Sequence, residues 1–141
     1  MSEINWAALQ QAAKNAAAQA YAPYSKFPVG VAVLASSGKI YSGCNVENAS
    51  YGGTICAERN AIAAAVVAGE RAFDALMVYT PQEMLTPPCG ICRQVIAEFF
   101  TPDSPVASCN HLGQQQSWTL AELLPSAFTP TYLANSTKVG A

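Results

Sequence analysis

The 141-residue chain is the size of one ordinary domain, and its 51% content of hydrophobic residues suffices for a continuous core. Only 11% of residues are charged, against roughly 25% in typical soluble domains, so we expect one domain over residues 1–141 that buries part of its surface in a homo-oligomer. Seven lysine and arginine residues and a formal net charge of −2 disfavour nucleic-acid strands, and no apolar stretch approaches the roughly 20 residues of a membrane span.

The N-terminus and the cysteine content indicate a cellular compartment. Residues 1–6 include an acid where a secretory signal carries basic residues, and no apolar segment follows them. We therefore expect a cytoplasmic protein. The five cysteines are an odd number in a chain without an export signal, which favours metal or thiol chemistry over a disulfide framework.

The first half of the chain predicts one helix and a pair of strands. Alanine-rich residues 7–20 have apolar side chains at helical spacing, and this helix ends before Pro23. Residues 29–34 and 39–44 are typical of strands, and residues 36–38 form a plausible hairpin turn between them. Residues 45–54 then form a loop.

The second half predicts alternating helices and strands. An apolar helix over residues 56–68 ends at Gly69, and residues 74–80 form a buried strand. The remaining predicted elements are a helix over 89–100, weaker strands over 106–110 and 117–120, and a short helix over 121–124. This order predicts a three-layer α/β fold. Residues 129–141 have no periodicity, and we expect a loose tail there.

Three cysteines stand at predicted helix starts. Cys89 and Cys92 form a Cys-x-x-Cys pair about one helical turn apart, so both sulfurs can point the same way, and Cys56 opens the earlier helix. Helix N-termini stabilise thiolates, the form that binds zinc, so these cysteines predict a metal site. A thioredoxin-like redox pair is the alternative, but that pair normally follows the first strand of its domain.

Glu58 stands two residues after Cys56, where its carboxylate can reach a metal-bound water without ligating the metal. A structural zinc site normally has four protein ligands, but neither Cys44 nor the single histidine, His111, has a spacing that marks it as the fourth. An open zinc position beside a carboxylate is what metal-assisted hydrolysis requires. We interpret Cys44, Cys109 and His111 as structural residues.

Several motifs agree with one family in order and spacing. They are Cys56-Ala57-Glu58-Arg59, Pro88-Cys89-Gly90-Ile91-Cys92-Arg93-Gln94, and the segments 24–30 (YSKFPVG), 45–51 (NVENASY) and 123–128 (LLPSAF). Over residues 21–128 the chain resembles the small cytidine deaminases, which are zinc-dependent nucleoside deaminases. Ile91 and residues 52–55 depart from the family pattern. The resemblance implies a three-layer α/β/α cytidine-deaminase-like fold with a central mixed five-stranded sheet.

The resemblance implies hydrolytic deamination of cytidine and 2′-deoxycytidine to uridine and 2′-deoxyuridine with release of ammonia, a reaction of pyrimidine salvage. One Zn²⁺ per subunit would be held by Cys56, Cys89 and Cys92, and a zinc-bound hydroxide would attack C4. Glu58 would act as the proton shuttle. Arg59 would hydrogen-bond the ligand sulfurs and offset their negative charge.

The resemblance also implies the substrate contacts. Phe27 would pack against the pyrimidine, the side chains of Asn45 and Glu47 would bind the ribose 3′-hydroxyl, and the backbone of Ala57 and Cys89 would meet the base edge. A phosphate at the 3′ position would face the Glu47 carboxylate, and like charges repel strongly where water is scarce. We therefore expect a free nucleoside as the substrate, with no nucleic acid and no membrane as partner.

Three further residues match positions that complete a neighbouring subunit's site in tetrameric family members. They are Ala49, Tyr51 and Phe128, and with the low charge content they favour a homotetramer. Two rival interpretations remain. The protein could deaminate another small aminopyrimidine, such as a nucleoside antibiotic related to blasticidin, although residues 45–48 favour a ribose-binding type. It could also be a non-catalytic zinc-stabilised module, which would need neither Glu58 nor the ribose-loop residues.

Overall fold

Five strands form one mixed sheet in the computed structural model, which describes residues 3–136. The strands are β1 (Gly30–Ala35), β2 (Ile40–Cys44), β3 (Phe73–Thr80), β4 (Pro105–Asn110) and β5 (Gln115–Thr119), in the spatial order β2-β1-β3-β4-β5. β3 and β4 run parallel, whereas the other neighbouring pairs are antiparallel. The mixed five-stranded sheet implied by the resemblance is therefore confirmed.

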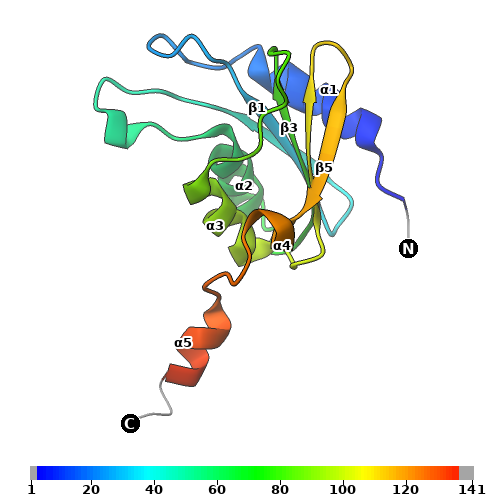
Figure 1. Ribbon diagram of the computed structural model, residues 1–141, viewed down its shortest axis with the longest axis vertical. Coiled ribbons are helices and arrows are strands. Elements are labelled where there is room, and N and C mark those ends of the chain that lie inside the picture. The colour runs from blue at the N-terminus through cyan, green and yellow to red at the C-terminus, as the bar shows by residue number, and fades with distance from the viewer. Residues whose placement is uncertain (1–2, 137–141) are drawn as a thin grey trace.

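Helices cover both faces of this sheet (Figure 1). α1 (Trp6–Ala17) packs on one face, and α2 (Ala57–Val67) and α3 (Gly90–Phe99) pack on the other. A 3-10 turn η1 (Tyr51–Gly53) precedes α2, the short α4 (Leu120–Leu123) follows β5, and α5 (Pro130–Ser136) projects away from the sheet. This arrangement confirms the three-layer α/β/α fold. Within residues 3–136, no helix is both long enough and apolar enough to cross a membrane.

The layers follow from the alternation of side chains along the strands. In β1, Val31 and Val33 belong to the core beneath α2 and α3, whereas Ala32 belongs to the core beneath α1. In β3, Leu76 and Met77 are fully buried on opposite faces. Because β3 is covered on both sides, it has a continuous apolar run instead of an apolar–polar alternation.

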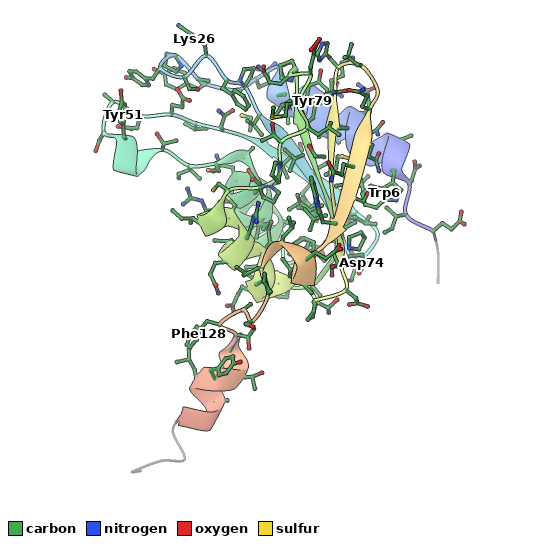
Figure 2. The ribbon with its side chains drawn as sticks, viewed as in Figure 1. Trp6, Lys26, Tyr51, Asp74, Tyr79 and Phe128 are labelled. Carbon is green, nitrogen blue, oxygen red and sulfur yellow. The ribbon has the colours of Figure 1, made fainter. Side chains whose placement is uncertain are left out.

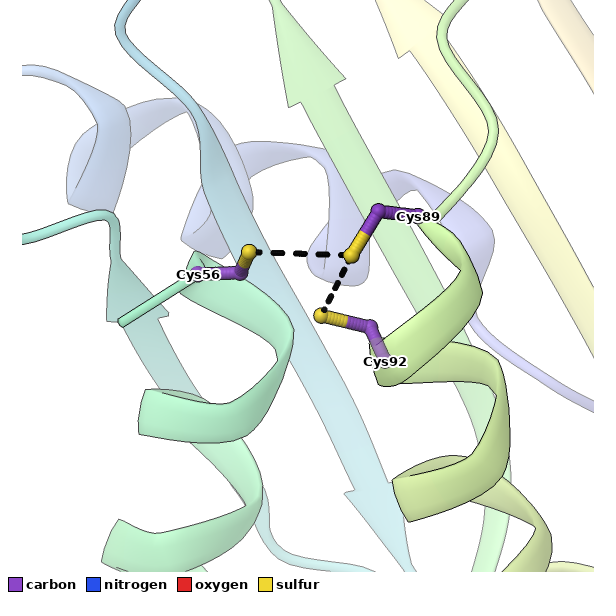
Figure 3. Close-up of side chains that lie close together, drawn as sticks. All are labelled: Cys56, Cys89 and Cys92. Atoms are coloured by element: carbon purple, nitrogen blue, oxygen red, sulfur yellow. Dashed lines mark hydrogen bonds between the residues drawn. The ribbon is translucent and has the colours of Figure 1, made fainter. Parts of the chain in front are cut away.

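The topology brings the starts of α2 and α3 together. β3 and β4 are parallel, so the chain must cross over between them, and α3 lies in that crossover. α2 lies beside α3 on the same face of the sheet, with its N-terminus at the same end (Figure 3). Cys56 and Cys89, which are 33 positions apart in sequence, thereby become neighbours.

Some element boundaries differ from the prediction. α1 ends at Ala17 instead of residue 20, and β5 spans Gln115–Thr119 instead of residues 117–120. β5 stops there because Thr119 caps α4 in a reciprocal pair of hydrogen bonds with Glu122. The sequence did not predict α5, because residues 130–136 have no helical apolar period. The loose tail expected over residues 129–141 stays a prediction, and residues 137–141 lie outside the described part.

The close packing of α1 on β1 depends on Gly30. A Cβ atom at this position would lie 1.9 Å from the carbonyl oxygen of Ala13 and 2.5 Å from the amide nitrogen of Ala17, both in α1. Backbone atoms of a packed helix cannot move aside locally. Gly30→Ala should therefore lower the free energy of unfolding by roughly 2–3 kcal/mol, measured by urea denaturation.

Gly52→Ala is the matched control, because a Cβ atom there meets nothing within 4 Å. It should change the free energy of unfolding by less than about 0.5 kcal/mol. Equal stabilities for the two variants would contradict the packing argument.

Candidate metal centre and active site

Three cysteine sulfurs converge at the starts of α2 and α3 (Figure 3). Cys56 and Cys89 are the N-cap residues of α2 and α3, and Cys92 lies in the first turn of α3. The Cys56 and Cys89 sulfurs are 3.7 Å apart, those of Cys89 and Cys92 are 3.3 Å apart, and all three lie within 4.8 Å of one another. Sulfur ligands about 2.3 Å from a tetrahedral zinc are about 3.8 Å apart. The cluster is therefore compatible with one zinc ion.

The surroundings of the cluster favour negative charge on the Cys56 sulfur. Hydrogen bonding with Cys92 lowers the pKa of Cys56 to about 5, and Arg59 adds to this effect. The same contact raises the pKa of Cys92, because its proton is shared with the Cys56 sulfur. A bound cation would favour loss of that proton, since zinc binds thiolates. All five cysteines are free thiols, as expected for metal or thiol chemistry.

Glu58 lies in the first turn of α2 and is buried, with 5% of its surface exposed. Burial raises the pKa of its carboxyl to about 7, because it removes the water that stabilises the charged form. The negative charge of Cys56 acts in the same direction, whereas Arg59 and the backbone N–H of Cys89 oppose it. This carboxyl can therefore both hold and release a proton near neutral pH.

Arg59 follows Glu58 and turns toward the sulfur cluster. Its Nη2 donates to the Cys56 sulfur at 3.8 Å and to the carbonyl oxygen of Thr54 at 3.4 Å. A cation in this position offsets negative charge on the sulfurs, as the resemblance implied.

One cavity of about 330 Å³ collects most of the predicted site residues. Its lining includes Phe27, Asn45, Glu47, Cys56, Ala57, Glu58 and Cys89. Cys92 is fully buried and does not line this cavity. The structure therefore places a buried carboxyl, two of the three cysteines and the predicted nucleoside-contacting residues around one space.

Two polar residues that line the cavity, Asn45 and Glu47, are held by internal hydrogen bonds. Asn45 is buried; its Oδ1 accepts from the Val29 N–H, and its Nδ2 donates to the Phe27 carbonyl oxygen, each at 2.9 Å. Glu47 accepts hydrogen bonds from the loop before β1, and the hydroxyl of Ser25 is the main cause that lowers the pKa of Glu47. Glu47 is therefore ionised at neutral pH.

Three predicted site residues lie outside this cavity. Ala49 and Tyr51 are exposed, and Tyr51 faces an adjoining hollow that it shares with Tyr24. Phe128 is 57% exposed and stacks on Tyr132 at the base of α5, on a different part of the molecule from Tyr51 (Figure 2). One chain therefore does not bring these side chains to its own cavity.

Sequence reasoning missed three polar residues that line the cavity, Ser25, Thr54 and Thr86. All three lie in irregular segments, where polar side chains have no period that would reveal their direction. The family segment 24–30 contains Ser25 and was the available signal. Cys109, interpreted as a small apolar strand residue, is buried in β4, and burial raises its pKa to about 11.

An α/β/α fold with clustered thiols and a buried carboxyl beside one cavity defines a class of zinc-dependent hydrolytic enzymes. Residues 5–108 match the model of the cytidine and deoxycytidylate deaminase zinc-binding region, and the chain belongs to this family.

Individual relatives agree with this assignment. A cytidine deaminase of Sporosarcina psychrophila is 53% identical over 116 residues, covering 82% of this chain and 85% of the relative. A cytidine deaminase of Mycobacterium tuberculosis H37Rv is 39% identical over 132 residues, covering 91% of this chain and 92% of the relative. The crystal structure of a cytidine deaminase from Burkholderia pseudomallei has a TM-score of 0.84 at 45% identity, covering 89% of this chain and 100% of that one.

Removal of one sulfur should remove the metal. We expect the purified protein to contain about one zinc per chain, and Cys92→Ser to lose most of it on dialysis against a mild chelator, because a hydroxyl is a much poorer zinc ligand than a thiolate. Elemental analysis measures the metal. Cys44→Ser is the matched control, since Cys44 is a partly buried cysteine at the end of β2 outside the cluster. Full zinc content in Cys92→Ser would contradict the site.

Proposed function

We propose that this protein hydrolyses cytidine and 2′-deoxycytidine to uridine and 2′-deoxyuridine with release of ammonia, in pyrimidine salvage. The observation that carries the proposal is the buried Glu58 carboxyl, whose pKa of about 7 suits proton transfer, in the same cavity as Cys56 and Cys89. When bound by Cys56, Cys89 and Cys92, zinc supplies Lewis-acid activation of the attacking water. Relatives named cytidine deaminase are similar to this chain over most of their length.

Glu58 moves the protons in the proposed reaction. Its carboxylate accepts a proton from the attacking water and delivers it to N3 of the pyrimidine, which prepares C4 for attack. Once the water oxygen has bonded to C4, its remaining proton passes through Glu58 to the amino nitrogen. The C4–N bond then breaks, ammonia leaves, and C4 keeps the oxygen as the carbonyl of uridine. Burial supports both steps, because a carboxyl with a pKa near 7 gives up its proton about as easily as it takes one.

The walls of the cavity bind the nucleoside in this proposal. Phe27 packs on the pyrimidine face, and the backbone groups of Ala57 and Cys89, at helix starts with free hydrogen-bonding capacity, meet the edge of the base. Asn45 and Glu47 bind the ribose 3′-hydroxyl. The ionised Glu47 can only accept a hydrogen bond, so it favours a hydroxyl and repels a 3′-phosphate. Free nucleosides are therefore favoured over polynucleotides.

The substrate is tested by ultraviolet monitoring of cytidine, deoxycytidine, cytosine, CMP and adenosine with the purified zinc protein. Glu58→Gln should keep the fold and the zinc but lose turnover about a thousandfold or more, because the amide cannot accept the proton. Glu98→Gln, an exposed position on α3, is the matched control and should keep wild-type turnover.

The wild-type pH profile provides a further check on Glu58. The reaction needs the carboxylate, so kcat/KM should fall as the pH drops through the pKa of Glu58. That pKa is about 7 without a metal, and a bound cation lowers it, so the acidic fall in kcat/KM should lie below pH 7. Activity on adenosine or CMP but not on cytidine, or near-normal turnover in Glu58→Gln, would overturn the proposal.

We also propose that neighbouring subunits of a homotetramer complete each active site. Tyr51 is 78% exposed and Phe128 is 57% exposed, and neither lines the cavity of its own chain. Exposed aromatic side chains of this size are typical of surfaces that bind another protein. Ala49, which lies close to Tyr51 in sequence, belongs to the same proposed contact. A cytoplasmic location stays a prediction from the sequence.

Subunit mixing tests this arrangement. Phe128→Ala and Glu58→Gln should each be impaired as pure proteins, because every site lacks one needed group. Co-expressed, they should regain activity, since some sites combine Glu58 of one chain with Phe128 of another. Steady-state rates are measured at several expression ratios of the two variants, and sedimentation velocity is the control for assembly. A mixture that shows only the average of the two pure proteins would refute shared sites.

A further inference from the structure

The hydroxyl of Ser25 joins two parts of the nucleoside cavity. It donates a hydrogen bond to Oε2 of Glu47, and at the same time it accepts one from the backbone N–H of Phe27 at 3.0 Å. A serine hydroxyl has one proton to donate and lone pairs to accept, so both bonds can exist together. The Glu47 carboxylate and the backbone of Phe27, which both belong to residues that line the cavity, are thus linked by one oxygen atom.

The rest of the loop is organised around the same carboxylate. Oε1 of Glu47 accepts from the backbone N–H groups of Tyr24 and Ser25 at 3.0 and 3.1 Å. Phe27, whose N–H donates to Ser25, also accepts at its carbonyl oxygen a hydrogen bond from Nδ2 of Asn45 at 2.9 Å. No helix or strand includes residues 24–29, so these side-chain bonds take the place of a regular hydrogen-bond ladder. The backbone of Phe27 is therefore held on both sides by polar side chains.

The loop between Ser25 and Phe27 is conformationally strained. Lys26 has φ 58°, in the left-handed region that residues with a Cβ atom disfavour. Such a conformation persists only where surrounding contacts enforce it. The Ser25 hydroxyl bridges the chain across Lys26, because it accepts a hydrogen bond from the backbone N–H of Phe27. Without this hydroxyl the loop could relax and carry Phe27 with it.

We propose that Ser25 is a positioning residue, which holds the Phe27 ring and the Glu47 carboxylate in the relative position that one bound nucleoside requires. The inference rests on the proposed function, because it assigns Phe27 to the base and Glu47 to the ribose. Ser25 lines the same cavity, but its role acts through these two neighbours. Both contacts hold the substrate before and during the reaction, so their loss weakens binding more than it slows chemistry.

Ser25→Ala removes both hydrogen bonds of the hydroxyl. We expect the KM for cytidine to rise about tenfold while kcat stays within about twofold, because a lost bond to a carboxylate has this order of effect. Binding of uridine, measured by calorimetry, should weaken by a similar factor. Ser25→Thr retains the hydroxyl and should restore values close to wild type.

Ser37 offers a matched control. Its hydroxyl donates to Oε2 of Glu70 at 2.8 Å and accepts from the backbone N–H of Lys39 at 3.4 Å, so it also joins a carboxylate to the amide two residues further on. This serine lies in the β1–β2 turn and does not line the cavity. Ser37→Ala should therefore leave both KM and uridine binding unchanged.

The outcomes separate the inference from the proposed function. A wild-type protein that neither converts cytidine nor binds uridine overturns the proposed function, and the inference with it. An active wild type with unchanged KM in Ser25→Ala, or with a loss confined to kcat, overturns the inference alone. Should Ser25→Ala fail to fold, Ser25→Thr and Ser25→Val repeat the comparison, since they differ only by a hydroxyl and a methyl group. Equal KM values for that pair would also overturn it.

Discussion

Two helix N-termini meet at three cysteine sulfurs, and the other groups of the site are arranged around this meeting point. Cys56 and Cys89 cap α2 and α3, so the positive ends of both helices face the sulfurs and favour thiolates. The helices must lie close to the sheet for this to occur. Gly43 in β2 permits the approach of α2, because a Cβ atom there would lie 2.4 Å from the amide nitrogen of Ala61. The sheet thus acts as a rigid support for two helix starts.

Balance of charge is the second constraint on the site. Three thiolates carry more negative charge than one zinc ion neutralises, and Glu58 lies in the same confined space. Arg59 contributes a cation at the Cys56 sulfur, and burial raises the pKa of Glu58 so that its proton is held near neutral pH. The same burial that makes the carboxylate unfavourable makes the group suitable for passing protons.

The substrate wall of the cavity is built differently from its metal wall. Helix starts position the cysteines and Glu58, whereas Phe27 and Glu47 stand on irregular segments that are joined by side-chain hydrogen bonds. A segment of this kind depends on individual polar groups and not on a repeating backbone pattern. Its conformation is therefore sensitive to single substitutions, even where the surrounding fold is unaffected.

Features that depend on near neighbours in the chain could be predicted from the sequence. Apolar periodicity predicted the strands and the helices α1 to α4, and the short spacings of Cys56 with Glu58 and of Cys89 with Cys92 predicted the reactive groups, because a helical turn sets their relative positions. The tertiary structure was needed to establish the sulfur–sulfur distance between Cys56 and Cys89, the burial of Glu58, the bridging role of Ser25, and the exposure of Tyr51 and Phe128 outside the cavity. These relations join segments far apart in the chain or without a period, so they depend on how the sheet and helices pack.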